Sequence, residues 1–238
     1  MLTRLLLLAV LAAGAACGGQ TDSIEMRAEE RVRLPEPGLE GAVSVEAALF
    51  ARRSIRGYDD SGLSLAEAGQ VLWAAYGVTK PMSGVERMRG GYRTAPSAGA
   101  TYPLEVYLVA AGVEGLTPGL YRYLSESHEL EPVAPGDIRP ALSRAALGQA
   151  SVREAPASVV WTAFYVRTTE RYGARGRERY VAMDLGHSAQ NVYLQAVALG
   201  LGTVAVGAFD DAEVSRVLGL AKSEEPLYIM PVGRLPTE

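Results

Sequence analysis

Apolar and polar positions along this chain follow two periods, one typical of amphipathic helices and one typical of strands. The helical period predicts helices over residues 44–51, 64–77, 137–148, 179–200 and 212–218. Apolar, β-branched runs predict strands over residues 104–110, 119–124, 130–134, 158–165, 203–209 and 227–232. Helices and strands interspersed in this way predict a single layered α+β domain.

Capping residues support the predicted helix boundaries. Ser44 is suited to cap the first helix, and Ser64 with Glu67 forms a capping box at the start of the second, which Gly77 ends. The segment 179–200 is apolar over much of its circumference, which predicts a central or interfacial helix. Residues 78–93 form a Gly- and Met-containing loop long enough to be functional.

The N-terminus has the layout of an export signal. One arginine, a short apolar run and small residues predict a signal peptide over residues 1–17, and the apolar run is too short to span a bilayer. Gly14-Ala15-Ala16-Cys17 resembles a lipoprotein cleavage box, so the mature protein is either lipid-anchored at Cys17 or released by ordinary signal cleavage. A cytoplasmic location follows only if this signal is misread. Residues 18–42 are predicted as a polar linker and residues 43–238 as the domain.

Composition excludes several classes of function. The net charge is −4, with 23 Lys and Arg against 27 Asp and Glu, so no basic face for nucleic acid is expected. One cysteine and two histidines far apart in sequence provide no disulfide, no thiol nucleophile and no zinc cluster. Demanding chemistry would therefore depend on a bound organic cofactor or on hydroxyl and carboxylate groups.

Two motifs are candidates for ligand binding. The run Arg52-Arg53-Ser54-Ile55-Arg56 offers guanidinium and hydroxyl donors suited to a phosphate, although cations are also favoured at a helix C-terminus without any ligand. The small residues from Thr94 to Pro103 allow a flat ligand to approach the backbone, although they also suit a plain turn.

Two further motifs match known fingerprints only in their letters. Gly200-Leu201-Gly202-Thr203-Val204-Ala205 follows a predicted helix and precedes a strand, the reverse of a dinucleotide-binding turn, so its glycines are expected to end the helix. Gly186-His187-Ser188-Ala189-Gln190 lies inside the long helix and has no histidine after it, which argues against a serine hydrolase.

Taken in order, several segments resemble the nitroreductase superfamily, and within it the SagB-like branch that includes the thiazole- and oxazole-forming peptide oxidases. The resemblance spans residues 43–235. The matching segments are Arg52 to Tyr58, Pro96 to Tyr107, Gly119 to Tyr123, Gly186 to Asn191, Ala198 to Gly202, Gly207 to Asp211 and Pro231 to Arg234.

The resemblance implies an α+β sandwich, with a central mixed sheet flanked by helices, that dimerises and holds FMN at the dimer interface. It assigns the phosphate and ribityl chain to Arg52, Arg53, Ser54 and Arg56, with Arg234 returning to the phosphate. It places Pro96, Ser97, Ala98 and Gly99 along the isoalloxazine ring, and Val206, Gly207 and Ala208 at its N5 edge. Many nitroreductases have Glu-Gly at this edge, and the glutamate is absent here.

The function implied is that of an FMN-dependent oxidoreductase transferring hydride through flavin N5 to or from a small organic substrate. No catalytic side chain is assigned. The electron donor or acceptor is unidentified, because an exported enzyme would not meet intracellular NAD(P)H. Arg179-Tyr180 stands where peptide-oxidising relatives have Lys-Tyr, which argues against azoline oxidation. The alternative is a protein that binds or processes flavin without reductase turnover.

Overall fold

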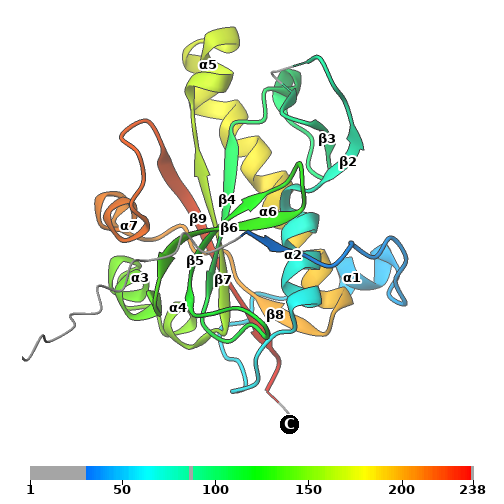
Figure 1. Ribbon diagram of the computed structural model, residues 1–238, viewed down its shortest axis with the longest axis vertical. Coiled ribbons are helices and arrows are strands. Elements are labelled where there is room, and N and C mark those ends of the chain that lie inside the picture. Colours follow the sequence, from blue (N-terminus) through cyan, green and yellow to red (C-terminus); the bar gives the residue numbers. More distant parts are fainter. Residues whose placement is uncertain (1–30, 86–87, 237–238) are drawn as a thin grey trace, which may run out of the picture.

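The computed structural model describes residues 31–85 and 88–236, and these form a sheet covered by helices (Figure 1). The predicted signal peptide and Cys17 lie outside the described residues. Seven strands make up the main sheet, in the order β1-β6-β5-β4-β7-β9-β8. The strands are β1 (Val32–Arg33), β4 (Leu104–Ala110), β5 (Gly119–Leu124), β6 (Glu129–Pro135), β7 (Ala157–Ala163), β8 (Leu201–Thr203) and β9 (Glu225–Arg234).

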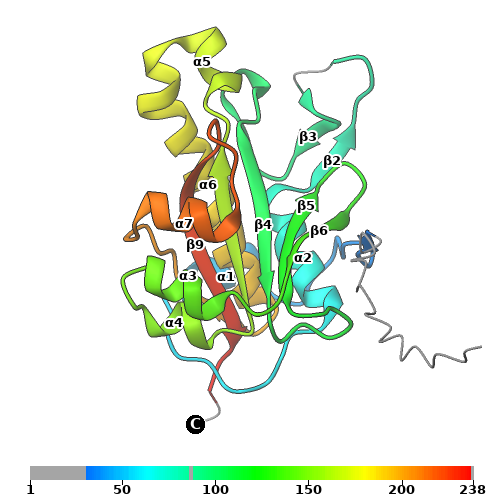
Figure 2. The ribbon, with the colours of Figure 1, turned by 60° about the vertical axis from the view of Figure 1, so that its left-hand side comes forward.

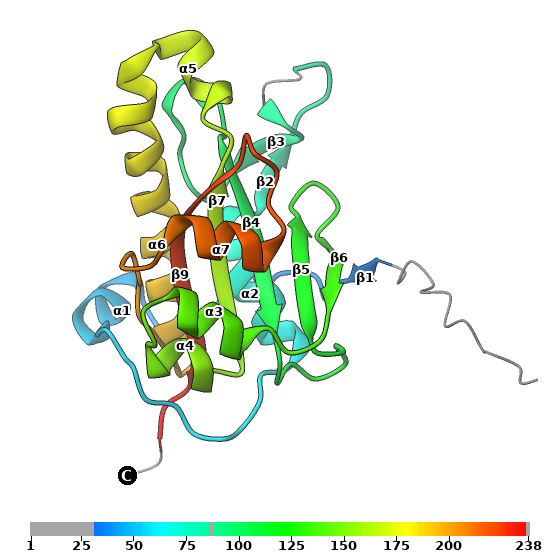
Figure 3. The same ribbon diagram turned by 90° about the vertical axis from the view of Figure 1, so that its left-hand side faces the viewer.

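Helices cover both faces of this sheet (Figures 2 and 3). One face packs against α2 (Leu65–Tyr76) and α6 (Val181–Ala198), and its core includes Trp161 and Leu72. The other face packs against α3 (Arg139–Ala145), α4 (Ala150–Glu154) and α7 (Asp211–Leu218), and its core includes Ile229. Every residue of β4 and β7 is buried, because both faces of these central strands are covered.

The strand pairing refines the predicted fold class. The α+β architecture with a helix-flanked sheet is confirmed, but all the pairs between named strands in the described residues are antiparallel. Parallel pairing occurs there only as single bridges, Ser54 with Thr203 and Leu63 with Val113. The sheet is therefore antiparallel rather than mixed.

Part of the predicted linker belongs to the domain. Val32 and Arg33 pair with β6, and Leu34 is buried in the core. The backbone of Gly38 exchanges hydrogen bonds with the side chain of Gln70 on α2, at 2.8 and 3.1 Å. The fold therefore begins before residue 43.

Most predicted elements are present, with differences at their ends. The ranges of β4 and β5 are as predicted, and α1 (Val45–Ala51) and α2 begin after Ser44 and the Ser64 capping box. The helix predicted over 137–148 is replaced by the shorter α3, with α4 following it. The strand predicted over 203–209 ends at Thr203, apart from one bridge between Val206 and Ile229.

Two segments project beyond the same end of the main sheet (Figures 1–3). The loop predicted over 78–93 contains a hairpin of β2 (Val78–Pro81) and β3 (Gly91–Arg93). Residues 166–180, which we call the arginine arm, comprise α5 (Val166–Tyr172) and a π-helix (Gly176–Tyr180) that leads into α6. None of the helices in the described part of the chain is long and apolar enough to cross a membrane.

Candidate functional site

The predicted phosphate-binding segment lies along an edge of the sheet. It follows α1 directly, and Ser54 forms a bridge with Thr203 of β8 while the Ile55 amide donates to the Thr203 carbonyl at 2.9 Å. Farther along, the Tyr58 hydroxyl donates to the carbonyl of Pro231 on β9 at 3.2 Å. The backbone of residues 54–58 is therefore held against β8 and β9.

Tyr193 of α6 fixes the side chains of this segment. Its hydroxyl accepts a hydrogen bond from the Ala205 amide at 2.8 Å and shares one with the Ser54 hydroxyl at 3.2 Å. The Arg52 guanidinium carbon lies 5.1 Å from the centre of the Tyr193 ring, a cation–π distance. One tyrosine thus orients both Arg52 and Ser54.

The guanidinium groups of Arg52, Arg53 and Arg56 have no carboxylate partner within salt-bridge distance in the described structure. The Arg53 side chain donates only to the carbonyls of Phe50 and Arg52, both at 2.8 Å. Arg53 and Arg56 are exposed, and Arg52 is half-buried. Arg52 and Arg53 are thus held by neighbours yet lack a counter-ion, which fits the binding of an anionic oxygen group.

The predicted ring-binding loop, Pro96–Gly99, rests on the opposite end of α6. The Ser97 hydroxyl and the Ala98 amide donate to the two carboxylate oxygens of Asp184, at 2.6 and 3.2 Å. Asp184 is buried, and this burial raises its pKa, against the opposing effect of the two hydrogen bonds and of nearby His187. The Asp184 carboxylate therefore fastens the loop to the helix at two points.

The backbone of this loop is strained. Gly99, Ala100 and Tyr102 have φ values of 59°, 52° and 44°, in the left-handed region that disfavours side chains. A Cβ atom at Gly99 would overlap the Tyr172 hydroxyl and lie 3.3 Å from Arg171 Nε. The loop thus requires glycine at residue 99 and is in close contact with the arginine arm. Such strain clusters at functional sites.

The segment predicted to pass flavin N5 has limited donors. Both backbone groups of Val206 are bonded to Ile229, at 2.8 and 3.0 Å, and its side chain is buried in the core. Gly207 packs against the Tyr228 ring, and the Ala208 carbonyl accepts from Gln149 at 3.0 Å. The exposed Gly207 and Ala208 amides are the N–H groups of this segment that remain for a ligand.

The side chain of Arg234 is paired with a carboxylate, unlike those of Arg52, Arg53 and Arg56. Its guanidinium donates to both carboxylate oxygens of Glu67, each at 2.9 Å, and it lines a different cavity from Arg53. Burial would raise the pKa of Glu67, but the hydrogen bonds from Ser64 and Arg234 outweigh it and lower the pKa. Its predicted role at a phosphate stays a prediction.

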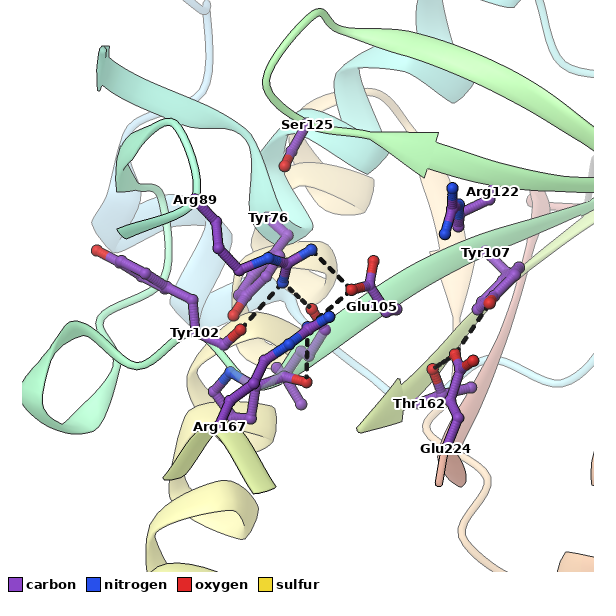
Figure 4. A network of polar contacts seen from close by, with 12 residues as sticks. Tyr76, Arg89, Tyr102, Glu105, Tyr107, Arg122, Ser125, Thr162, Arg167 and Glu224 are labelled. Atoms are coloured by element: carbon purple, nitrogen blue, oxygen red, sulfur yellow. Dashed lines mark hydrogen bonds and ion pairs between the residues drawn. The ribbon is translucent and has the colours of Figure 1, made fainter. Parts of the chain in front are cut away.

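A second group of arginines is fully paired (Figure 4). Arg89 of the β2–β3 hairpin loop and Arg167 of the arginine arm both reach the same oxygen of Glu105 on β4, at 2.6 and 2.7 Å. The Glu105 side chain is only 9% exposed, and the two arginines are 26% and 27% exposed. Arg89 also donates to the carbonyls of Tyr102 and Leu104, at 3.0 and 3.2 Å. This network fastens both projecting segments to the sheet.

Within one subunit the structure does not bring the whole predicted site together. Asp184, beneath the loop, and Tyr193, beside the arginines, are separated by nine residues of α6, which corresponds to about 14 Å of helix. The cavity that Arg53 lines has a volume of ≈ 280 Å³, below the roughly 300–1,000 Å³ of typical ligand pockets. The residues present fit the two ends of an extended anionic ligand rather than one enclosed pocket.

Sequence reasoning assigned no role to the polar residues of α6 that support the loop. Asp184, His187 and Asn191 follow the helical spacing i, i+3, i+7, and all three contact the segment 94–98. His187 Nδ1 lies 3.4 Å from the Pro96 carbonyl, and the Asn191 amide donates to the Thr94 carbonyl at 3.1 Å. Polar residues at this spacing on a mostly apolar helix were the feature of the sequence from which these contacts could have been predicted.

Comparison with known proteins identifies the family. A model of the Nitroreductase family matches residues 49–234. The chain belongs to the nitroreductase family. The nitroreductase homologue MJ1384 of Methanocaldococcus jannaschii is 47% identical over 192 residues, which cover 81% of this chain and 91% of that protein.

Other nitroreductase relatives agree in fold and branch. A crystal structure from Ralstonia eutropha JMP134, named as a nitroreductase, matches with a TM-score of 0.74 and 32% identity, covering 89% of this chain and 92% of that chain. The microcin B17-processing protein McbC of Escherichia coli is 28% identical over 217 residues, which cover 86% of this chain and 76% of that protein. The similarity to McbC supports the predicted SagB-like branch.

Proposed function

We propose that this nitroreductase-family protein is an FMN-dependent oxidoreductase that exchanges hydride equivalents with a small organic substrate. The observation that carries the proposal is the group of guanidiniums at Arg52, Arg53 and Arg56, which lack a carboxylate partner in the described structure and lie beside a hydroxyl fixed by Tyr193.

In this proposal, the chain supplies position and electrostatics. FMN, when bound, supplies the site that accepts and releases hydride. Arg52, Arg53, Ser54 and Arg56 hold its phosphate, and the Pro96–Gly99 loop, fixed by Asp184, gives a flat surface for the ring. Gly207 and Ala208 offer amides to the ring edge, and Arg234 would have to exchange Glu67 for the phosphate to take part.

A second copy of the chain is proposed to complete the site. The Pro96–Gly99 loop contacts α6 at Asp184, and the arginine segment contacts it at Tyr193, so a single subunit does not enclose the cofactor. Next to the arginines, α1 exposes Val45, Leu49 and Phe50, the last with 82% of its surface accessible. Apolar side chains of this size on one helix suit burial against another subunit.

Selective loss of phosphate recognition tests the cofactor proposal. Apoprotein with Arg53→Gln and Arg56→Gln should bind FMN at least tenfold more weakly, while its affinity for riboflavin, which lacks the phosphate, stays the same. Flavin fluorescence quenching measures both affinities. Because these side chains are exposed, the free energy of unfolding should change by less than about 0.5 kcal/mol. Arg153→Gln, which removes another exposed arginine, is the matched control. Equal weakening of both flavins would contradict the assignment.

Turnover separates an oxidoreductase from a protein that only binds or processes flavin. The yellow holoprotein should be bleached by anaerobic photoreduction and regain its absorbance when a quinone or nitroaromatic compound is added. A holoprotein that bleaches but is not reoxidised would favour the flavin-binding alternative.

Export of the protein, with or without a lipid anchor at Cys17, is proposed from the sequence alone. Fractionation of the native cells should find the protein outside the cytoplasm without its first residues. An intact N-terminus in the cytosol would overturn this assignment.

A further inference from the structure

The arginine arm carries a strong positive charge. Residues 166–180 contain five arginines and two glutamates, a net charge of +3 on a chain whose net charge is −4. Two of these arginines have carboxylate partners: Arg167 with Glu105 and Arg177 with Glu225, each at 2.7 Å. The other three, Arg171, Arg175 and Arg179, have none within salt-bridge distance in the described residues, and of these Arg171 and Arg175 lie over tyrosine rings.

Tyrosine rings hold these two side chains in place. The Arg171 guanidinium lies 5.4 Å from the centre of the Tyr172 ring, and that of Arg175 lies 5.6 Å from the Tyr180 ring. Arg175 Nε donates to the Tyr180 hydroxyl at 2.8 Å, which leaves its terminal nitrogens available. Tyr172 and Tyr180 themselves pack edge to face with their centres 4.9 Å apart. Ordered donors lose little entropy on binding a ligand.

The cluster lies against the loop assigned to the cofactor ring. Arg171 Nε and the Tyr172 hydroxyl are the atoms that a Cβ at Gly99 would meet. The π-helix that carries Tyr180 is a rare geometry that is frequently found at functional sites. The network around Glu105 fixes the base of the arm through Arg167. A molecule that reacts at the ring would therefore pass next to Arg171, and Arg175 is connected to it through the packed Tyr172 and Tyr180 rings.

We propose that Arg171 and Arg175 bind an anionic oxygen group, a carboxylate or a phosphate, of the redox substrate, so that this protein selects anionic over neutral substrates. The inference rests on the proposed function, because it assumes that the reacting ring lies along the Pro96–Gly99 loop. In this proposal the arginine arm selects the class of substrate. The arginines at residues 52–56 hold the cofactor phosphate and do not affect that choice.

Binding of unreactive ligands to the FMN-loaded protein tests the inference. Benzoate, phenyl phosphate and benzamide share a ring and differ in charge, and their dissociation constants follow from titrations of the flavin absorption spectrum. Benzoate or phenyl phosphate should bind at least tenfold more tightly than benzamide, and the preference should weaken as salt is added. The anion with the lower dissociation constant shows whether the arm prefers a carboxylate or a phosphate.

Variants then locate the preference on the arm. Arg171→Gln with Arg175→Gln should abolish the difference between anion and amide without changing benzamide affinity, whereas Arg153→Gln should retain it. Benzamide binding as tightly as both anions, or a preference that survives in the double variant, would overturn the inference while leaving the FMN proposal intact. A protein that does not take up FMN at all would instead overturn the proposed function.

Discussion

Two groups of arginines in this molecule have the same chemistry and opposite surroundings. Arg89 and Arg167 converge on the buried Glu105, whereas Arg52, Arg53 and Arg56 meet no carboxylate in the described structure. The paired group fastens two projecting segments to the sheet, so its charges are used within the fold. In the other group, Arg52 lies over Tyr193 and Arg53 donates to backbone carbonyls, but neither has a counter-ion. All of these residues are arginines, so residue type alone does not separate the structural role from the proposed binding role. The presence of a carboxylate partner, and the burial of that partner, do separate them.

The comparison predicts the largest loss of stability from the paired group. Glu105→Gln removes the charge that neutralises Arg89 and Arg167 and should lower the free energy of unfolding by roughly 2–3 kcal/mol. Urea denaturation measures the effect. Glu131→Gln, which breaks more exposed pairs with Arg31 and Arg122, should cost less than about 1 kcal/mol. Similar losses in the two variants would show that burial does not distinguish the groups.

The contact between the arginine arm and the loop predicts a somewhat smaller effect. Gly99→Ala should cost roughly 2 kcal/mol, about half from the left-handed backbone and the rest from overlap with the Tyr172 hydroxyl. Gly148→Ala is the matched control, since φ there is 76° and no atom lies within 4 Å of the added Cβ. Thermal or urea unfolding of both variants isolates the contact. Equal costs at the two glycines would mean that the arm does not press on the loop.

Arg234 is an intermediate case, because it is paired yet 38% exposed. Glu67→Gln removes its partner and part of the α2 capping box, and should cost about 1 kcal/mol at neutral pH. The pKa of Glu67 is lowered in the fold, so this stabilisation is present above its unfolded value of about 4.3 and is lost as the pH falls through the lower folded value. Denaturation of wild type and variant across this range should give converging curves.

The control for that experiment is Glu213→Gln on α7, whose pair with Arg216 is more exposed. It should change stability by less than about 0.5 kcal/mol at any pH. A difference between wild type and Glu67→Gln that persists at the lowest pH would assign the effect to packing instead of charge.

The fold was predictable where local signals and tertiary packing agree. The apolar runs at β4 and β5 have their predicted bounds, and the Ser64 capping box begins α2. The two residues of β1 were missed, because their pairing depends on a strand almost one hundred positions away. The strand predicted to continue past Thr203 stops there, because the Ala205 amide is taken by the Tyr193 hydroxyl. That partner belongs to another element and is not visible in a local pattern.

The candidate site shows the same division. The donors at residues 52–56 and the small residues at 96–99 could be chosen from the sequence, because their chemistry is local. The residues that fix them, Asp184 and Tyr193, lie nearly ninety and one hundred and forty positions from their partners. Arg234 was grouped with the phosphate ligands, while its pairing with Glu67 depends on how α2 lies beside β9.

The bridge between Ser54 and Thr203 gives the segment that we propose to bind the cofactor a further role. Residues 54 and 55 cover the outer side of β8, a strand that ends the sheet and would otherwise present open backbone groups to other molecules. A ligand that orders this segment would also keep the edge of β8 covered. Loss of the ligand would then expose the unpaired backbone groups of this edge strand. The protein without ligand should therefore self-associate more readily than the protein with ligand bound.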